Sequence, residues 1–489
     1  MTTKAKVFEG VNKQFIGGKW KEGTSGKVAT IEDPFDNSEF AKVVLASKED
    51  VDEAYNSAKR AQKKWAITSK EEKVDVLERA IRIMEENKKE IVDIIAREAG
   101  GTVLKGNLEV QLTLDIMNEA KTFPHRMEPK TEPSAIPGKE NRIYRFPIGV
   151  MSVISPFNFP LNLSMRSVVT AIAAGNAVVH KPALQTAITG GGVIAKVFEL
   201  AGLPAGVFNL IITSSSETGD YFVEHPIPKF ISFTGSTEVG RHIGSLAGKH
   251  LKRVALELGG NSPFVVLKDA DVDQAVNAAI FGKFVHQGQI CMIVNRILVH
   301  RDIYDEFAEK FTKRASELPY GDPKDSKNII GPIANEKQIE TIMGLIETAK
   351  KEGALVSLEG KRAGNVITPF VFTNVTNDMT IAQSEIFGPL ATLIPFDSDE
   401  EGIQLANDTE YGLSSAIFTS DLARGEEFAK QVESGMTHVN DQTVNDEPTV
   451  PFGGVKDSGI GRFGGEWVLD EFTTMKWISV QKEDRVFPF

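Results

Sequence analysis

Cysteine is almost missing from this sequence, which holds a single one, Cys291, in 489 residues. A lone thiol excludes an intramolecular disulfide and agrees with a reducing compartment, so we expect a cytoplasmic protein. The eight histidines form no HExxH motif and no cluster with cysteine. Zinc and similar ions need several such ligands at fixed spacing, and no metal site is therefore expected.

Long apolar runs and an excess of positive charge are also missing. No run approaches the roughly 18 apolar residues of a membrane-spanning helix, and the N-terminus lacks the apolar stretch of a signal peptide. The formal net charge is −12 and the isoelectric point is near 5.4. Nucleic acids and anionic membranes are bound by basic patches, so we expect neither as a partner.

The composition that remains is that of an ordinary globular enzyme, with 41% hydrophobic and 25% charged residues. A single core rarely grows beyond about 300 residues, so the length predicts two or three domains.

Two long amphipathic helices are expected after an extended N-terminal region. Ser47 opens the first. Ser69 and Glu72 have the spacing of a capping box for the second, whose apolar residues recur at helical spacing until Gly100.

From Gly149 onward, apolar strands alternate with helical stretches. The expected strands cover residues 149–154, 176–180, 207–212, 230–233, 254–258 and 264–267. Strands separated by helices pair in parallel and bury both faces of the sheet. The alternation therefore predicts a parallel sheet covered by helices.

Prolines punctuate residues 124–147, at positions 124, 129, 133, 137 and 147. Proline breaks helices and removes a hydrogen-bond donor from central strands, so this segment is expected to leave the first domain. Residues 474–481 have the apolar, β-branched character of a strand. A mobile surface loop is the alternative for the proline-rich segment.

Five short segments contain residue types that can carry chemistry. They are Ser155-Pro156-Phe157-Asn158-Phe159-Pro160, Gly235-Ser236-Thr237-Glu238-Val239-Gly240, Leu256-Glu257-Leu258-Gly259-Gly260, Gln287-Gly288-Gln289-Ile290-Cys291 and Glu385-Ile386-Phe387-Gly388-Pro389. The second follows a strand and opens a helix, so free N–H groups can face a pyrophosphate. Singly, each segment has a plainer interpretation: a buried thiol, a turn-forming asparagine, solvated glutamates or a common glycine turn.

Taken in order, these segments resemble the signature set of the aldehyde dehydrogenase superfamily, and most of all its benzaldehyde and vanillin dehydrogenases. The resemblance extends from residues 15–20 to residues 451–459. It implies an α/β fold with a Rossmann-type dinucleotide-binding domain (1–123 and 148–257) and a cysteine-bearing catalytic domain (258–460). It also implies a small β arm (124–147 and 470–489) that joins subunits into a homodimer or homotetramer.

The same resemblance implies a covalent mechanism centred on Cys291, Asn158 and Glu257. The Cys291 thiolate attacks the aldehyde to give a thiohemiacetal and then a thioester, while Asn158 and the backbone N–H of Cys291 stabilise the oxyanion. Glu257 activates the water that hydrolyses the thioester. Relatives that pass the acyl group to coenzyme A usually lack this glutamate, so a hydrolytic enzyme is expected.

A nicotinamide cofactor, NAD or NADP, is implied as well. Its expected contacts are Ser155, Pro156, Phe157, Lys181, Ala183, Leu184, Gly235, Ser236, Gly240, Leu258, Glu385 and Phe387. One position departs from the pattern of NAD-selective relatives, which commonly carry a glutamate where this chain has Leu184. A carboxylate there would repel a 2′-phosphate, so we expect that both cofactors can be used.

The expected substrate is an aromatic aldehyde. Candidate contacts are Phe159, Asn162, Arg166, Ile290, Met292 and Phe452, of which Arg166 is expected at the aldehyde entrance. Four alternatives stay open. Arg166 could instead pair with a surface carboxylate, or the enzyme could oxidise glyceraldehyde-3-phosphate without phosphorylation, or another aliphatic aldehyde or semialdehyde. A catalytically silent structural member is the alternative from another class.

Overall fold

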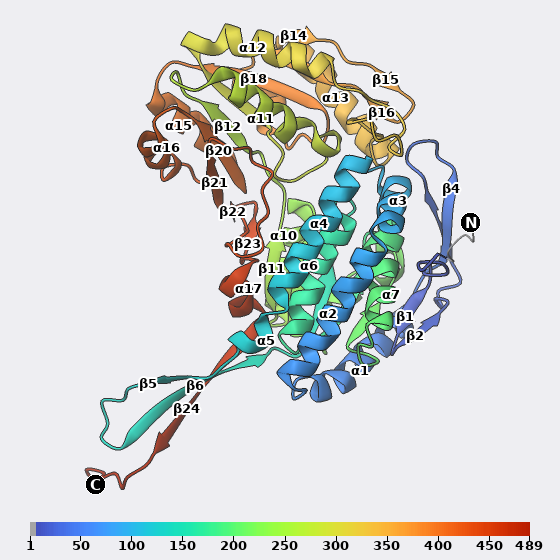
Figure 1. Ribbon diagram of the computed structural model, residues 1–489, viewed down its shortest axis with the longest axis vertical. Coiled ribbons are helices and arrows are strands. Elements are labelled where there is room, and N and C mark those ends of the chain that lie inside the picture. Colours follow the sequence, from blue (N-terminus) through green and yellow to red (C-terminus); the bar gives the residue numbers. More distant parts are fainter. Residues whose placement is uncertain (1–5) are drawn as a thin grey trace.

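The computed structural model describes residues 6–489 as two α/β lobes and a projecting arm (Figure 1). The first lobe is built on an eight-stranded sheet in the order β2-β1-β9-β8-β7-β10-β11-β23. Its five central strands are parallel: β9 (Phe208–Leu210), β8 (Ala177–Lys181), β7 (Val150–Ile154), β10 (Phe230–Thr234) and β11 (Arg253–Glu257). The expected parallel sheet is confirmed for five of the six expected strands, whereas the sixth, residues 264–267, corresponds to β12 (Pro263–Val266) of the second sheet.

Both edges of this sheet are closed by antiparallel strands. β1 (Gln14–Ile16) pairs with β9 and with β2 (Lys19–Lys21). On the other edge, β23 (Gly459–Ile460) pairs with β11, so that Gly459 lies opposite Glu257. A segment from near the end of the chain is thereby brought beside a candidate catalytic residue.

Alternating side chains bury the two faces of the sheet under different helices. Val150, Ala177 and Val179 pack with α1 (Lys48–Trp65) in one cluster. Residues on the opposite face, such as Met151 and Val153, belong to a larger cluster that includes residues of several other helices. Among them are α2 (Lys70–Glu86), α4 (Val103–Ala120), α6 (Pro160–Ala173) and α7 (Val193–Leu200).

The second expected helix is divided, which corrects the expectation of one helix up to Gly100. α2 ends at Glu86 and α3 (Lys88–Ala99) begins after Asn87, whose side-chain amide donates to the Ile83 carbonyl at 2.7 Å. Asparagine side chains compete in this way with the backbone ladder. Ser69 accepts from the Glu72 N–H, but both halves of a capping box are present at Ser47, with Asp50.

The second lobe contains a seven-stranded sheet in the order β14-β17-β18-β13-β12-β20-β21. Its strands are β14 (Leu355–Leu358), β17 (Phe370–Thr373), β18 (Leu390–Phe396), β13 (Arg296–His300), β12 (Pro263–Val266), β20 (Ser414–Phe418) and β21 (Met436–Val439). Only the β14–β17 pair within this sheet is antiparallel. α11 (Val272–Phe284) and α12 (Arg301–Ser316) cover one face, and α13 (Glu336–Glu352) covers the other.

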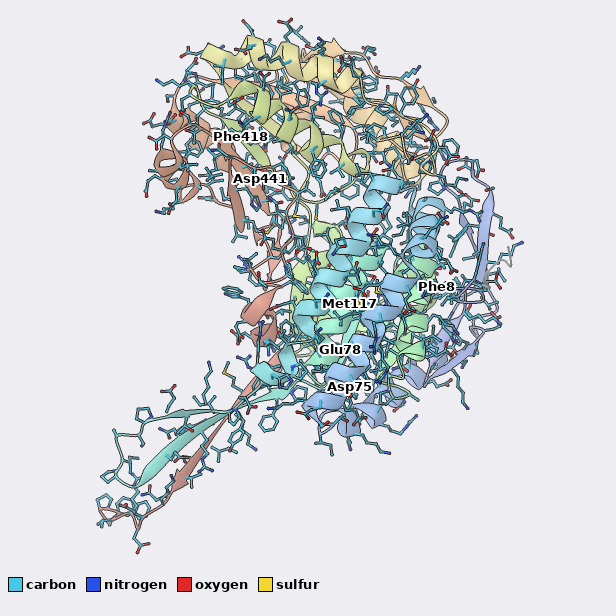
Figure 2. All side chains as sticks on the ribbon, in the orientation of Figure 1. Phe8, Asp75, Glu78, Met117, Phe418 and Asp441 are labelled. Carbon is cyan, nitrogen blue, oxygen red and sulfur yellow. The ribbon has the colours of Figure 1, made fainter. Side chains whose placement is uncertain are left out.

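The proline-rich segment contributes two strands to the projecting arm, which corrects the alternative of a surface loop. β6 (Lys139–Pro147) pairs along its whole length with β24 (Thr473–Gln481), and β5 (Lys130–Glu132) pairs with β6. Figure 2 shows side chains standing out on both sides of this arm, where Met475 and Trp477 are exposed. Over residues 6–489, no helix is long and apolar enough to cross a membrane.

Candidate active site

The carboxyl ends of the parallel strands bring three of the five sequence segments to one edge of the first sheet. β7 ends at Ile154, and Asn158 lies four residues beyond it. Ile154 pairs with Phe233 of β10, and Thr234 pairs with Glu257 at the end of β11. Ligands of open α/β sheets bind outside this edge. The topology therefore places residues 155–158, 235–236 and 257–258 around one site.

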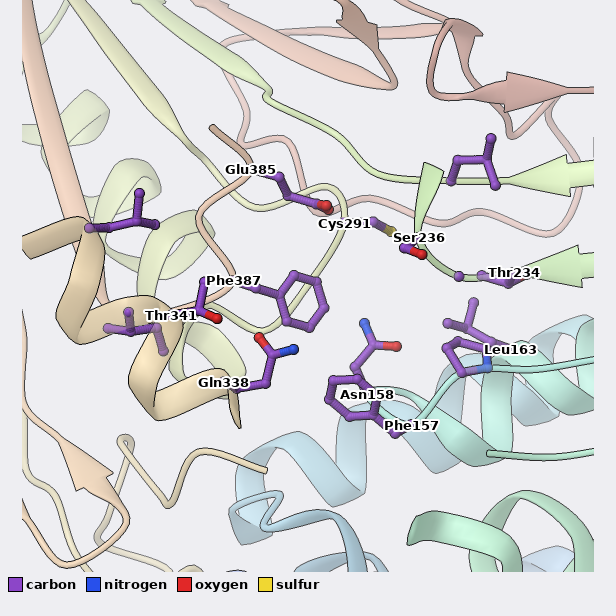
Figure 3. A pocket seen from close by; sticks show the side chains of 15 residues that line it. Phe157, Asn158, Leu163, Thr234, Ser236, Cys291, Gln338, Thr341, Glu385 and Phe387 are labelled. Atoms are coloured by element: carbon purple, nitrogen blue, oxygen red, sulfur yellow. The ribbon is translucent and has the colours of Figure 1, made fainter. Parts of the chain in front are cut away.

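Two cavities meet at Cys291, and Asn158 and Leu163 also line both of them. The first, which we call the strand-end cavity, has a volume of about 220 Å³ and is lined by Pro156, Phe157, Thr234, Gly235, Ser236, Leu258, Gln338, Thr341, Ile342, Leu345, Glu385 and Phe387. Figure 3 shows side chains from both lobes converging on it. The second, which we call the loop cavity, has a volume of about 270 Å³. Its additional lining is Leu108, Leu112, Phe159, Asn162, Phe281, Ile290, Met292, Gln442, Val444, Asn445, Asp446, Glu447 and Phe452.

The loop before Cys291 has a constrained backbone. His286 and Gln287 adopt left-handed conformations with φ of 52° and 57°. Gly288 follows with φ of 78°, and a Cβ there would lie 2.2 Å from the Gly388 carbonyl oxygen. Only glycine fits such a close backbone approach. The Gln287 amide also donates to the carbonyls of Gly100 and Pro332, which fixes the loop against the body.

Asn158 is held directly beside this loop. Its side-chain nitrogen donates to the Gln289 carbonyl at 3.0 Å, and the residue is buried. An amide nitrogen carries two hydrogens, so one remains for another acceptor. Nearby, Glu109 of α4 accepts from the backbone N–H groups of Leu161 and Asn162 at 2.8 and 3.3 Å, which satisfies the start of α6.

Glu109 forms a fully buried ion pair with Lys105, whose ammonium group also lies 4.4 Å from the centre of the Phe159 ring. This pair was not expected from the sequence. A Lys/Glu spacing of four residues on a helix is normally a solvent-exposed contact, so no sequence signal distinguished it.

Burial dominates the electrostatics of the titratable groups at the junction. It raises the pKa of Glu257 to about 8, a rise that Asp446 adds to and that Arg166 and Arg462 oppose. It also raises the pKa of the Cys291 thiol to about 12, with the Glu257 and Glu385 carboxylates adding to the rise. In this state the thiol is therefore protonated at neutral pH.

The strand-end cavity has the features of a dinucleotide site. Ser236 and Gly235 lie at the start of α10 (Thr237–Lys249), where helix N–H groups are free to meet phosphate. Glu385 accepts from the Gly260 N–H at 3.2 Å, and burial raises the pKa of its carboxyl to about 7. Phe157 and Phe387 contact edge to face, with ring centres 5.9 Å apart.

Five of the expected cofactor contacts lie outside this cavity. Gly240 packs beneath it, because a Cβ there would lie 2.2 Å from Leu258. The Ser155 hydroxyl is buried and hydrogen-bonds to Ser164 and His180 at 2.6 and 2.9 Å. The other three lie at or just after the end of β8, which pairs with β7 in the sheet. Lys181 is the last residue of β8, and Ala183 and Leu184 follow it.

The loop cavity contains five of the six expected substrate contacts: Phe159, Asn162, Ile290, Met292 and Phe452. Within residues 6–489, the buried Asn162 Oδ1 has no hydrogen-bond partner. The described lining has no lysine or arginine, whereas Asp446 and Glu447 contribute carboxyl groups.

Arg166 does not line the loop cavity, contrary to the expectation that it lies at the aldehyde entrance. It is buried and faces two buried carboxyl groups, Glu257 and Asp446, so the alternative of a surface carboxylate is not met either. The spacing of Asn162 and Arg166 along α6 suggested a shared face but did not show what covers Arg166. The loop residues 442–447 belong to no recognisable motif, and the sequence analysis missed them.

In the described part of the chain, no group of three or more histidine, cysteine, aspartate or glutamate side chains is placed to hold a metal ion.

The chain is similar to known proteins over nearly its whole length. The Aldehyde dehydrogenase family profile matches residues 20–478. Benzaldehyde dehydrogenase YfmT of Bacillus subtilis is 53% identical over 99% of both chains, and vanillin dehydrogenase of Corynebacterium glutamicum is 50% identical over 97% of this chain and 99% of its own. A crystal structure of an NAD-dependent benzaldehyde dehydrogenase from Corynebacterium glutamicum superposes with a TM-score of 0.90 at 46% identity, covering 98% of each chain.

Proposed function

Because this chain belongs to the aldehyde dehydrogenase family, we propose that it oxidises an aromatic aldehyde to the carboxylic acid with NAD or NADP. The observation that carries the proposal is the meeting of two cavities at Cys291. One cavity suits a dinucleotide, and the other suits a small, flat, apolar molecule. The Cys291 thiol at their junction can attack the carbonyl carbon of an aldehyde in the loop cavity. The same carbon would then face the strand-end cavity.

In this proposal Cys291 is the nucleophile and Asn158 supplies an N–H to the oxyanion. After the thiol has lost its proton, the Cys291 thiolate forms a bond to the carbonyl carbon and an electron pair moves to the oxygen, where the free Asn158 hydrogen and the Cys291 backbone N–H stabilise the charge. The hydrogen bond from Asn158 to Gln289 supports this role, because it fixes the amide beside the cysteine loop.

Glu257 is the proposed base that activates water for hydrolysis of the Cys291 thioester. Water adds to the acyl carbon, the water proton goes to the carboxylate, and the carbon–sulfur bond breaks to release the acid. A carboxyl with a pKa of about 8 is matched to this task near neutral pH. The hydrolytic assignment, rather than transfer to coenzyme A, rests on this residue.

The chain's residues fit a nicotinamide cofactor in the strand-end cavity. Gly235 and Ser236 would hold the pyrophosphate, Glu385 the nicotinamide ribose, and Phe387 would pack against the ring, with Lys181 and Leu184 near the adenosine ribose. When bound, the cofactor supplies the hydride acceptor and a positive charge that favours the thiolate. Dual use of NAD and NADP is proposed because Leu184 presents no charge to a 2′-phosphate.

An aromatic substrate is proposed because rings and aliphatic side chains dominate the loop cavity. A flat ring gains roughly 25 cal/mol per Å² of apolar area that it buries. A phosphorylated three-carbon aldehyde gains little of this, and it would meet Asp446 and Glu447 without a cation in the described lining. Relatives named for benzaldehyde and vanillin support the same choice.

The proposal includes the domain division and the assembly. We assign residues 1–123 and 148–257 to cofactor binding, 258–460 to the catalytic domain, and 124–147 with 470–489 to an oligomerisation arm. The exposed apolar side chains of the arm, Phe146, Met475, Trp477 and Ile478, support an interface between copies in a homodimer or homotetramer.

A substrate panel tests the proposal. Benzaldehyde, hexanal and glyceraldehyde-3-phosphate are each incubated with NAD and with NADP, and formation of reduced cofactor is followed by absorbance. We expect benzaldehyde to have the highest kcat/KM. Fastest oxidation of the phosphorylated aldehyde would overturn the aromatic assignment, and no reduction with any pair would indicate a silent member of the family.

A further inference from the structure

Arg166 is held inside the protein between two aromatic rings. Its guanidinium carbon lies 4.4 Å from the ring centre of Phe452 and 4.4 Å from that of Phe463, and the residue is 3% exposed. A planar cation between two ring faces is attracted by both and has little freedom to move. Arg166 is therefore a fixed positive charge behind the wall of the loop cavity.

The fixed cation lies between two carboxyl groups. Arg166 Nη2 is 3.8 Å from Glu257 Oε2, and Nη1 is 3.6 Å from Asp446 Oδ2. Both distances exceed a hydrogen bond, so the attraction is Coulombic rather than a locked contact. Within the described residues, Arg166 Nε and Nη1 and Glu257 Oε1 have no hydrogen-bond partner.

Three other ionisable groups face this cluster from neighbouring elements. Arg462 donates to the carbonyls of Gly454 and Gly461 at 2.8 Å, and its charge acts on Glu257. The Glu119 carboxyl borders a small cavity with Arg166 and Asp446, but it pairs with Arg126 at 2.7 Å. The charge of Glu257 in turn acts on the Cys291 thiol.

We propose that Arg166 and Asp446 are positioning residues that act as an opposed pair of charges on Glu257. The cation draws the Glu257 carboxylate toward the Phe452 side of the site and favours its ionised form, while Asp446 competes for the same guanidinium and weakens that effect. This inference rests on the proposed role of Glu257 as the base for thioester hydrolysis. It assigns Arg166 a role other than contact with the aldehyde.

Because Arg166 and Asp446 carry opposite charges, removing either one should shift the pKa of Glu257 in the direction opposite to removing the other. Neutralising Asp446 leaves Arg166 with Glu257 alone, so the pKa of Glu257 should fall below its value of about 8. Removing the guanidinium leaves two carboxyl groups without the cation between them, and the pKa of Glu257 should rise. A purely structural pair would lower activity in both variants without moving the pH midpoint in opposite directions.

The test measures stopped-flow bursts and the pH dependence of the steady phase, with saturating benzaldehyde, which carries no ring substituent to contact Asp446. Asp446→Asn should move the midpoint down, and Arg166→Met should move it up, each by about one pH unit. Arg166→Lys keeps a charge and should return the midpoint toward wild type. Glu119→Gln is the matched control, because that carboxyl borders the same small cavity but pairs with Arg126.

Unshifted midpoints with a full burst in both variants, or shifts in the same direction, would overturn the inference. If Arg166→Met does not fold, the nearly isosteric Asp446→Asn decides alone. Glu257→Gln separates this inference from the proposed function. A blocked steady phase in Glu257→Gln with unshifted midpoints in the other variants rejects only the positioning role, whereas a normal steady phase in Glu257→Gln rejects both.

Discussion

The two cavities that meet at Cys291 are built in different ways. The strand-end cavity takes much of its lining from strand termini and the start of α10, where backbone groups and a few polar side chains have fixed positions. The loop cavity is lined by side chains of α4, α6, α11, the cysteine loop and residues 442–447. The strand-end cavity can hold a ligand by directed polar contacts. The loop cavity can hold a ligand by burying the ligand's apolar surface.

Because the two cavities share few residues, most substitutions should affect only one side of the site. Three residues, Asn158, Leu163 and Cys291, line both cavities, so substitutions at the two polar ones should affect the reaction whatever the ligand on either side. A substitution confined to the cofactor region should leave the choice of aldehyde unchanged.

The largest effect is expected for Cys291→Ala, because the chain has no second thiol that could replace the nucleophile. Aldehyde oxidation should be abolished while the fold and cofactor binding persist. Steady-state turnover and a cofactor titration measure the two properties on the same preparation. Turnover above roughly a hundredth of wild type would contradict the covalent mechanism.

Glu257→Gln should separate the two halves of the reaction. We expect a burst of about one reduced cofactor per site and then very slow turnover, since acylation needs the thiol and hydrolysis needs the base. In the wild type, the steady rate should rise with pH through about 8, because the carboxyl must lose its proton to accept one from water. Stopped-flow absorbance measures both, and an unaltered pH profile in the variant would assign water activation to another group.

Seven of the twelve expected cofactor contacts line the strand-end cavity, and five of the six expected substrate contacts line the loop cavity. The parallel order of the first sheet follows from a local pattern of strands and helices, whereas the roles of Gly235 and Glu257 were expected only from the resemblance to aldehyde dehydrogenases. The contacts of Asp446 and Phe463 with Arg166 could not be predicted, because they form only when distant chain segments fold back over α6. A helical spacing places Arg166 on a face of α6, but it contains no information about the distant residues that cover that face.

Asn158→Ala should reduce the rate of the hydride step by roughly 10² to 10³ if its amide faces the oxyanion. Cofactor affinity should change little, because the phosphate and ribose contacts proposed for the strand-end cavity remain. Single-turnover kinetics with benzaldehyde isolate this step from thioester hydrolysis. An unchanged single-turnover rate would remove Asn158 from oxyanion stabilisation and leave it a role in holding the cysteine loop through Gln289.

The smallest effect is expected on the cofactor side, at Leu184. The wild type should use NADP with a kcat/KM within about tenfold of that for NAD, a difference of roughly 1.4 kcal/mol or less. Leu184→Glu should shift the preference toward NAD, because its carboxylate would repel a 2′-phosphate, whereas Leu184→Gln is the uncharged control. The ratio of kcat/KM for benzaldehyde and hexanal should stay at its wild-type value in both variants, because Leu184 lies outside the described lining of the loop cavity. A wild-type preference for NAD above a thousandfold would mean that another acidic group guards the ribose. A changed aldehyde ratio in Leu184→Glu would show that the two sides of the site are coupled.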